Sequence, residues 1–450
     1  MFRKEMGVAD IQPMSAIRYP ALDQTELVSP PYDVLELKDK QAMLARNAHN
    51  IVAVDLPHVP PKVAGPATAY QQAADQLTQW LSSGILRRDD VPGLYPYEQT
   101  YTHEGRVYQR RGLFCRVRLE EFGPTGTIHP HEQTFSGPKE DRLLLTRATR
   151  CNLSPVFGLY DDPQNTVTGT LFTGLGQPVA HASLPSMDGR SEVKSSLWRV
   201  TDAAAINQVR KLLAEKHLYI ADGHHRYGTS LNYRLELESA SGPLPDDHPA
   251  NFVMFVLVAM QDPGLIIMPT HRTVSNLNGF SLDAFLAAAG SRLTAATPEK
   301  FPGDKLPELE KRLASWGSHA MAVYDPKSDK AIIVKPTNDD PLKEFATSTS
   351  IVIHSAQWRS LDVAILQELI FDRIVKPRFA PAGELHWAFP HEAKDVLHLC
   401  RQENHQAGFV LQPTPLQAVR DLCHHNELMP QKSTFFYPKL ATGMLINPLF

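Results

Sequence analysis

The alternation of hydrophobic and polar positions predicts two β-hairpins in separate regions of the chain. In residues 93–119, aromatic and β-branched side chains lie on both sides of a polar turn at 103–105, as expected for two adjoining strands. Residues 322–334 repeat this arrangement, because two apolar triplets flank the turn-forming sequence DPKSD. Both segments are therefore expected to form antiparallel strand pairs.

Helical patterns occur between such strands. Apolar side chains recur at helical spacing over 70–81, and Gly84 follows where a left-handed cap would lie. Residues 408–411 indicate a short strand, after which Thr414 and Pro415 supply an N-cap and a first-turn proline for a helix. No repeat of fixed period occurs, which excludes solenoids and propellers. The pattern predicts an α/β or mixed α+β protein, with mixed sheets and flanking helices.

The length and the distribution of polar residues suggest three regions. At about 150 residues per domain, 450 residues correspond to three units or two large ones. A stretch rich in Gly, Pro and Ser at 161–192 is the best internal boundary, and 336–350 is a weaker one. We therefore expect an N-terminal α+β region at 1–160, a core region at 161–345 and a C-terminal α/β region at 346–450. Whether these regions form separate domains or are interwoven in the fold stays open.

Composition excludes several classes of protein. The 45 basic and 49 acidic residues give a net charge of −4, which disfavours nucleic acid as the main partner. The four cysteines form no CxxC pair, as is typical of reduced cytoplasmic thiols. The longest apolar run, at 251–260, is about half of a membrane span, and the N-terminal residues lack the apolar core of a signal. We expect a soluble, cytoplasmic protein without a membrane partner; whether it forms a homo-oligomer stays open.

The segment that carries the most chemistry begins with an expected strand at 218–221. A glycine, Gly223, follows it, and an amphipathic helix is expected to begin after that glycine. Its stripe consists of Leu231, Arg234, Leu235 and Glu238. A strand that turns into a helix at a glycine exposes unpaired amides at the helix N-terminus, where they favour an anion.

Residues 222–226 (DGHHR) place five chemically capable residues at this junction. Arg226 is expected to bind a phosphate through two nitrogens, and Asp222 to hold a divalent metal or a hydroxyl group. His224 and His225 are donors whose charge changes near neutral pH. The alternative is a polar turn in which the histidines only cap backbone groups. The clustering of these residues favours a phosphate or nucleotide site.

The DGHHR sequence resembles the signature loop of the ParB/sulfiredoxin-like fold, whose members bind nucleotide phosphates there and include free serine kinases. The whole chain also resembles the bacterial and archaeal family called domain of unknown function 1015. The matching blocks are 30–34, 131–134, 137–143, 219–227, 269–272, 361–363 and 429–439. The resemblance implies a ParB/sulfiredoxin-like strand–loop–helix core and a reaction of the serine kinase type.

A second group of polar residues follows the sequence HPHE at 129–132. Two imidazoles and a carboxylate would suit Zn²⁺ or Mn²⁺, with His224 and His225 completing the shell, but the spacing matches no known zinc motif. We prefer carboxylates acting on a magnesium-bound phosphate while nearby cations neutralise its charge. These residues are Glu132 and Asp141 for the metal, and Lys139 and Arg142 for the phosphate. The alternative is a solvated charged loop before a helix.

Three further segments present single functional groups. The prolines of 30–33 fix a rigid turn that presents Asp33, which would take a proton from an acceptor hydroxyl. His271 and Arg272 lie at an expected strand end. Lys432 precedes an expected aromatic strand, and Lys439 follows that strand. Either lysine would suit a phosphate. The alternative for each segment is a structural turn or a solvated strand end.

These observations predict phosphoryl transfer between ATP or ADP and a small hydroxylated metabolite, with Mg²⁺ or Mn²⁺ as cofactor. Serine or phosphoserine is the first candidate, because of the resemblance to free serine kinases. The expected catalytic residues are Asp33, Glu132, Asp222 and His224; the metal ligands are Asp222, Glu132 and Asp141. The expected phosphate and nucleotide contacts are Gly223, His224, His225, Arg226, Lys139, Arg142, His271, Arg272 and Lys432. A metal-dependent phosphatase or esterase and a non-catalytic nucleotide sensor are the alternatives; P-loop and Rossmann motifs do not occur.

Overall fold

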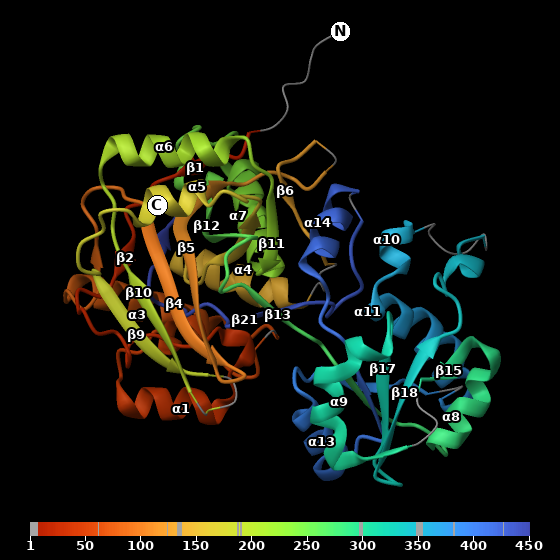
Figure 1. The fold of residues 1–450 in the computed structure, drawn as a ribbon. Helices are drawn as coiled ribbons and strands as arrows, with labels where there is room; N and C mark the ends of the chain where they lie inside the picture. The colour runs from red at the N-terminus through yellow and green to blue at the C-terminus, as the bar shows by residue number, and fades with distance from the viewer. Residues whose placement is uncertain are drawn as a thin grey trace. The chain divides into compact units, whose positions relative to one another are not determined.

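The computed structural model of the chain forms two compact units (Figure 1). It describes residues 8–61, 63–123, 125–132, 137–186, 189, 191–296, 300–347, 354–380, 383–425 and 427–450, without the side chains of 137–139, 346–347 and 424. Unit 1 comprises residues 1–130, 134–266 and 438–450, and unit 2 comprises 131–133 and 267–437. Neither unit is continuous in sequence. Within the described ranges, no helix is both long and apolar enough to cross a membrane.

Unit 1 is built on a mixed sheet in which nine strands can be described. Their order is β6-β11-β8-β12-β5-β4-β10-β9, and β1 pairs with β5. The strands are β1 (Ile11–Gln12), β4 (Tyr95–His103), β5 (Arg106–Arg118), β6 (Ile128–His129), β8 (Val156–Tyr160), β9 (Ala180–Pro185), β10 (Glu192–Leu197), β11 (Leu218–Asp222) and β12 (Phe252–Ala259). The pairs β6–β11 and β8–β12 are parallel. Two short antiparallel pairs accompany the sheet, β2 (Ile17–Arg18) with β3 (Arg87–Arg88), and β7 (Cys151–Asn152) with β22 (Asn447–Pro448).

The predicted hairpin at 93–119 is confirmed as β4 and β5. Glu104 and Gly105 form the turn with φ angles of 50° and 77°, the left-handed conformation that tight hairpin turns require. Cross-strand packing fixes the register, since the rings of Tyr101 and Tyr108 stack with centroids 5.6 Å apart on directly opposed residues.

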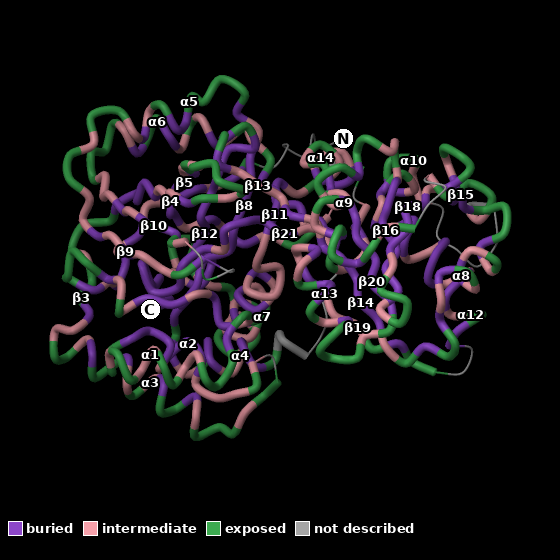
Figure 2. Tube along the Cα trace, turned by 60° about the horizontal axis from the view of Figure 1, so that its bottom comes forward, coloured by how far each residue is buried: buried purple, intermediate pink, exposed green. Residues whose placement is uncertain are grey.

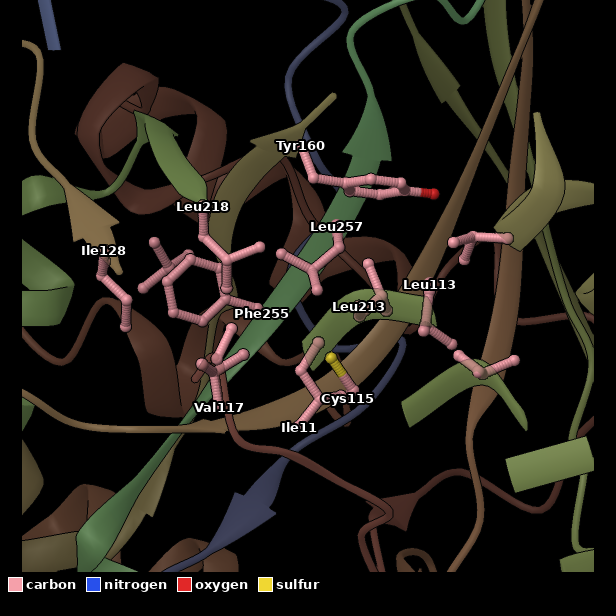
Figure 3. Packing of buried hydrophobic residues seen from close by; sticks show 14 of the residues in the cluster. Ile11, Leu113, Cys115, Val117, Ile128, Tyr160, Leu213, Leu218, Phe255 and Leu257 are labelled. Carbon is pink, nitrogen blue, oxygen red and sulfur yellow. The ribbon is translucent and has the colours of Figure 1, made fainter. Parts of the chain in front are cut away.

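Strand β12 lies at the centre of the hydrophobic core of unit 1. All eight of its residues are buried, although successive side chains of a strand point to opposite faces. Val253, Phe255 and Leu257 pack into a cluster with Leu113 and other apolar residues, several of which Figure 3 shows. The alternate side chains of β12 are equally buried, so both faces of this strand are covered (Figure 2). That explains the uninterrupted apolar run at 251–260.

Helices cover the sheet of unit 1. They are α1 (Leu37–Arg46), α2 (Val52–Asp55), α3 (Ala67–Ser82), α4 (Gly137–Thr149), α5 (Thr166–Phe172), α6 (Ala203–Ala214) and α7 (His224–Ser241), with short 3₁₀ turns η1 (Tyr32–Val34) and η2 (Pro249–Asn251). Helix α6 contributes Val209 and Leu213 to the same cluster as β12. Helix α4 packs against both α3 and α7. The helix expected at 70–81 is confirmed as α3, and Gly84 after it has a φ of 79°.

Unit 2 contains an antiparallel sheet of seven described strands. Six follow the order β15-β18-β17-β20-β14-β19, and β16 pairs with β18. These strands are β14 (Arg272–Ser275), β15 (Leu293–Ala295), β16 (Phe301–Pro302), β17 (Met321–Asp325), β18 (Lys330–Pro336), β19 (His386–Ala388) and β20 (Ala407–Val410); separately, β13 (Ile266–Met268) pairs with β21 (Phe435–Tyr437). The hairpin expected at 322–334 is confirmed as β17 and β18.

The helices of unit 2 pack around this sheet. They are α8 (Leu282–Ala289), α9 (Leu306–Arg312), α10 (Ala356–Arg359), α11 (Asp362–Ile365), α12 (Lys376–Phe379), α13 (Ala393–Gln402) and α14 (Leu416–His424), with a π-helical segment η7 (Leu366–Val375) and 3₁₀ turns η3 (Gly290–Arg292), η4 (Gly303–Lys305), η5 (Leu313–Trp316) and η6 (Lys343–Thr347). Leu306 of α9 and Val396 of α13 share a core with Ile333 of β18. Mixed α/β architecture with flanking helices is confirmed for both units.

Two details differ from the sequence prediction. Helix α7 buries the expected leucine stripe only in part: Leu231 packs partly buried against the core of unit 1, whereas Leu235 is 40% exposed. Tyr227 and Tyr233 are buried instead; Tyr227 packs against Phe255 of β12, and its hydroxyl donates to the Glu120 carbonyl at 2.7 Å. Pro415, and not Thr414, occupies the N-cap position of α14, since the Thr414 hydroxyl donates to the Ser433 carbonyl at 2.7 Å.

The division into units also differs from the three expected regions. The boundary expected between 160 and 161 falls inside unit 1, and the one between 345 and 346 falls inside unit 2. The polar stretch 161–192 contains α5 and β9, which is the terminal strand of the sheet. Surface elements at a sheet edge have the same polar composition as a linker, so composition alone did not distinguish them.

Candidate functional site

The junction between β11 and α7 has the geometry that the DGHHR sequence suggested. Strand β11 ends at Asp222, Gly223 adopts a φ of 91°, and α7 begins at His224. A Cβ atom at Gly223 would lie 3.0 Å from the guanidinium group of Arg226, in a conformation that L-residues rarely adopt. The glycine therefore lets the chain turn directly into an 18-residue helix. The first amides of such a helix have no partner within the helix and carry the positive end of its dipole.

The Asp222 carboxylate lies between two cations at this junction. Arg226 Nη2 donates to Asp222 Oδ2 at 2.6 Å, and Lys439 Nζ donates to Asp222 Oδ1 at 3.1 Å. Burial alone would raise the pKa of the Asp222 carboxyl, but the charges of Lys439 and Arg226 lower it below its ordinary value. The Asp222 carboxylate is therefore ionised at neutral pH and has the Arg226 and Lys439 side chains as its partners.

Arg226 is held on more than one side. Besides Asp222, it donates through Nη1 to the carbonyl of Pro155. Burial lowers the pKa of its guanidinium, whereas the negative charges of Asp222 and then Asp33 raise it, so that the result lies above the ordinary value. The two-nitrogen fork expected to face a phosphate thus faces protein oxygens in this structure, and an incoming phosphate would have to share the guanidinium with them.

The turn at 30–33 lies in the same part of unit 1. Tyr32 is buried, and the guanidinium of Arg142 lies over its ring, 3.9 Å from the centroid. Asp33 is half-buried in η1, and its negative charge acts on Arg226. Segments more than 180 residues apart in the sequence, 30–33 and 222–226, are therefore brought together within one unit.

Asp141 and Arg142 lie next to this turn, but their polar atoms contact protein groups. Asp141 is fully buried: its Oδ1 accepts from the Tyr70 hydroxyl at 2.8 Å and lies 2.9 Å from His58 Nε2. Arg142 donates through Nε to Asp141 at 2.9 Å and through Nη1 to the carbonyl of Asp55 at 2.7 Å. These contacts connect α4 to α2 and α3. The Lys139 side chain lies outside the described residues.

The remaining expected site residues belong to unit 2, and there Glu132 binds a backbone loop. Its carboxylate accepts from the amides of Lys432, Ser433 and Thr434 at 3.2, 3.0 and 3.1 Å. Lys432 has a φ of 60°, which turns these consecutive amides toward one point, as in backbone anion nests. Glu132 thus fills, in this structure, a nest of the kind that holds anions.

His271 and Arg272 are also occupied within unit 2. The His271 ring is fully buried; its Nδ1 accepts from the Leu411 amide at 3.1 Å, and Nε2 lies 2.9 Å from a Glu310 oxygen. Arg272 donates to the carbonyls of Thr270 at 2.6 Å and Lys432 at 2.9 Å. Burial lowers the pKa of Arg272 to about 10. Both nitrogens of His271 already have protein partners, so this geometry gives its expected phosphate contact no support.

The expected site residues therefore fall into two groups. Unit 1 brings together Asp33, Asp141, Arg142 and residues 222–226, whereas unit 2 contains Glu132, His271, Arg272 and Lys432. One site shared by both groups stays a prediction. Among the described residues, no three His, Cys, Asp or Glu side chains are grouped as a metal site would need.

Several residues at the junction carried no distinct sequence signal. Lys439 was one of two lysines considered for phosphate, and only its contact with Asp222 singles it out. Asp55, His58 and Tyr70 lie in helices or loops whose pattern indicated packing alone. Selecting these residues from sequence would have required information on which positions covary among related sequences.

The fold and this junction define a mixed α/β protein in which a helix N-terminus lies beside an aspartate that is paired with an arginine and a lysine. The chain belongs to the family described as Protein of unknown function (DUF1015), whose model matches residues 11–364. No curated protein matches it.

Three solved structures are distantly similar. A free serine kinase in complex with AMP is 12% identical, with a TM-score of 0.31, covering 71% of this chain and 89% of its own. SbnI with a C-terminal truncation, from Staphylococcus aureus, is 11% identical, with a TM-score of 0.33 over 72% of this chain and 84% of its own. A conserved hypothetical protein from Pyrococcus furiosus is 12% identical, with a TM-score of 0.31 over 71% and 92%. Similarity this distant carries no argument about the present chain.

Proposed function

We propose that the protein transfers a phosphoryl group between ATP or ADP and a small hydroxylated metabolite. The observation that carries this proposal is the β11–α7 junction, where Asp222 lies between Arg226 and Lys439 directly before a helix N-terminus. Serine or phosphoserine is the first candidate metabolite, and this choice comes only from the resemblance of the DGHHR loop to that of free serine kinases. The direction of transfer is part of the test.

The phosphates would bind to the amides at the start of α7. Gly223, His224 and His225 carry the amides at which the dipole of this long helix favours negative charge. Arg226 and Lys439 add two positive charges beside them. The absence of a Cβ at Gly223 leaves room for the Arg226 guanidinium, which would lie 3.0 Å from such an atom. This combination of backbone donors and charged groups is the arrangement that phosphoryl transfer needs for positioning and charge neutralisation.

A magnesium ion at the junction would have to displace Arg226 or Lys439 from one oxygen of Asp222, since each of these cations now contacts one of them. Mg²⁺ usually takes one or two protein carboxylates together with substrate phosphates and water. Asp222 offers a carboxylate that its neighbours keep ionised, and Asp33 offers a second one in the same unit. Bound there, Mg²⁺ would neutralise charge on the transferred phosphoryl group. We assign Asp222 to the metal and Asp33 to the acceptor hydroxyl, while His224, as the first residue of α7, would donate to a phosphate oxygen.

A phosphate-exchange assay tests the proposal. Purified protein with serine, ATP and Mg²⁺, or with phosphoserine, ADP and Mg²⁺, is expected to show new ³¹P resonances for phosphoserine or ATP respectively. EDTA should abolish the exchange, because the metal neutralises the phosphate charge. Exchange that persists in EDTA would contradict the assigned metal role.

Two other results would support other functions. Hydrolysis of a simple phosphoester without exchange would indicate a metal-dependent hydrolase. Tight binding of ADP with neither reaction would indicate a nucleotide sensor. Both would contradict phosphoryl transfer to serine, and a panel of other small hydroxylated acceptors would then decide whether the reaction class itself is retained.

A further inference from the structure

A small cavity lies within unit 1, next to Arg226. Its volume is about 40 Å³, and helices α2, α4 and α7, strand β12 and the segment 151–154 line it and leave it partly open. The polar residues that line it are Asp55, Arg142, Thr146, Asn152, Ser154, Arg226, Thr229 and Ser230. None of the sequence motifs pointed to Asp55 or to Thr229. A cavity with this lining differs from an apolar packing defect, which stays dry.

Apart from Arg142 Nη2, which forms an ion pair with Asp141 at 2.8 Å, two buried polar atoms of the cavity wall lack a hydrogen-bond partner among the described residues, and one of them belongs to Asp55. The residue is 2% exposed. Its Oδ1 lies 3.3 Å from Arg142 Nη1 and accepts from the Ser154 hydroxyl at 3.4 Å, whereas its Oδ2 makes no hydrogen bond with the described part of the chain. Burial raises the pKa of the Asp55 carboxyl, and the positive charges of Arg142 and then Arg226 oppose that rise. Asp55 is therefore coupled to the arginine of the DGHHR loop.

Thr229 is the other such group. It lies in α7, three residues after Arg226, is 2% exposed, and its Oγ1 has no hydrogen-bond partner in the described part of the chain. Other hydroxyl groups of the cavity wall are already used: Thr146 donates to the Arg142 carbonyl at 2.8 Å, and Ser230 to the Arg226 carbonyl at 3.0 Å. Buried polar groups nearly always have a partner, from the protein or from ordered water.

The cavity is large enough for ordered water, since its volume is about 40 Å³. A buried water needs roughly 10–15 Å³ of such space and two to four polar partners. Asp55 accepts hydrogen bonds, and Thr229 both accepts and donates, so a water between them would satisfy each. A metal cation is disfavoured because the guanidinium groups of Arg142 and Arg226 share the cavity wall, and an anion is disfavoured by the Asp55 carboxylate.

We propose that this cavity is the site of one ordered water that joins Asp55 to Thr229, and that Asp55 is a positioning residue for Arg226. Asp222 and Pro155 accept hydrogen bonds from Arg226, whereas Asp55, which lines the same cavity as Arg226, attracts it by its negative charge. The positioning role of Asp55 rests on the proposed function, because Arg226 is the cation that would neutralise the phosphates. The water site does not depend on the proposed function.

Crystal structures of the protein without nucleotide test both halves. The wild-type protein is expected to contain a water within hydrogen-bond distance of both Asp55 Oδ2 and Thr229 Oγ1. Thr229→Val keeps the side-chain shape and should lose this water. Thr146→Val is the matched control in the same cavity, and should keep the water because the Thr146 hydroxyl is already used. A dry cavity in the wild-type protein, or a water that stays in place in Thr229→Val, would overturn the water site.

Asp55→Asn tests the positioning role. In its crystal structure, the Arg226 guanidinium should move away from residue 55 and stay paired with Asp222, and the affinity for ADP should fall about tenfold, the equivalent of roughly one charge-assisted contact. A carboxylate that acted only through its charge would have the opposite effect, since its removal strengthens anion binding. Equal or tighter ADP binding, with Arg226 unmoved, would therefore overturn the positioning role. If the wild-type protein binds no ADP, the proposed function fails. The position of Arg226 in the Asp55→Asn structure then still decides whether Asp55 positions Arg226.

Discussion

Replacing Asp222 with asparagine is expected to lower phosphate exchange by roughly 100-fold or more, because rate in such reactions depends on positioned charges. The substitution keeps the shape of the side chain and removes the carboxylate that we assign to the metal. It also leaves Arg226 and Lys439 without their shared counter-ion. ADP binding measured without a divalent metal should not weaken, since the junction becomes more positive. Initial exchange rates by ³¹P NMR and calorimetric titration with ADP measure the two quantities separately.

A matched control for Asp222→Asn is Asp329→Asn. Asp329 forms an ion pair with Arg401 at 2.7 Å in unit 2, and more than half of its side chain is exposed. The control substitution therefore breaks an arginine–aspartate pair without touching the junction, and exchange should stay within about twofold of wild type, since surface pairs contribute little. If Asp222→Asn retains exchange, or if it loses exchange only together with its melting transition, Asp222 has no catalytic role.

Lys439→Met is expected to weaken ADP binding by about 1.5–3 kcal/mol, roughly 10- to 150-fold in affinity, the range for hydrogen bonds to charged groups. Two effects act in the same direction. The variant loses a positive charge near the phosphates, and Asp222 loses one of its two cationic partners, so its negative charge is less neutralised. Methionine keeps most of the aliphatic side chain, which limits the loss of packing. Calorimetric titration with ADP measures the change.

Lys216→Met is the corresponding control. Lys216 precedes β11 at the end opposite Asp222, donates to the Asp161 carbonyl at 2.7 Å and pairs with Asp162 at 3.5 Å. Lys216→Met changes the net charge of unit 1 by the same amount as Lys439→Met, so it controls for long-range electrostatic effects on ADP binding. ADP affinity in Lys216→Met should stay close to that of wild type. An equal loss in both variants would mean that Lys439 acts through the overall charge and does not contact the phosphates.

The local parts of this account could be predicted from sequence. The strand, glycine and helix at 218–241 and the two hairpins follow from residue periodicity and turn chemistry over short segments, and the structure confirms them. Helix α7 shows where such reasoning stops. The stripe of Leu231 and Leu235 predicted one buried face, but Leu235 is 40% exposed, and Tyr227 is buried against β12. Which face of a helix is buried depends on the elements that pack against it.

Long-range contacts set the rest of the site, and the sequence carried no signal for them. Lys439 reaches Asp222 from 217 residues away, because the segment 438–450 returns to unit 1 after the whole of unit 2. Asp141, expected to bind a metal, instead accepts from Tyr70, 71 residues earlier. Residue chemistry selected these charged groups as candidates, but which of them pair with each other depends on topology.

A crystal structure of the wild-type protein with ADP tests the central claim most directly. The account predicts that the terminal phosphate of ADP lies within hydrogen-bond distance, about 2.7–3.2 Å, of amides among Gly223, His224 and His225, with Lys439 beside it. The adenosine need not contact α7. ADP phosphates bound elsewhere in the protein, with the β11–α7 junction in its present geometry and without a ligand, would contradict the claim that this junction is the nucleotide phosphate site.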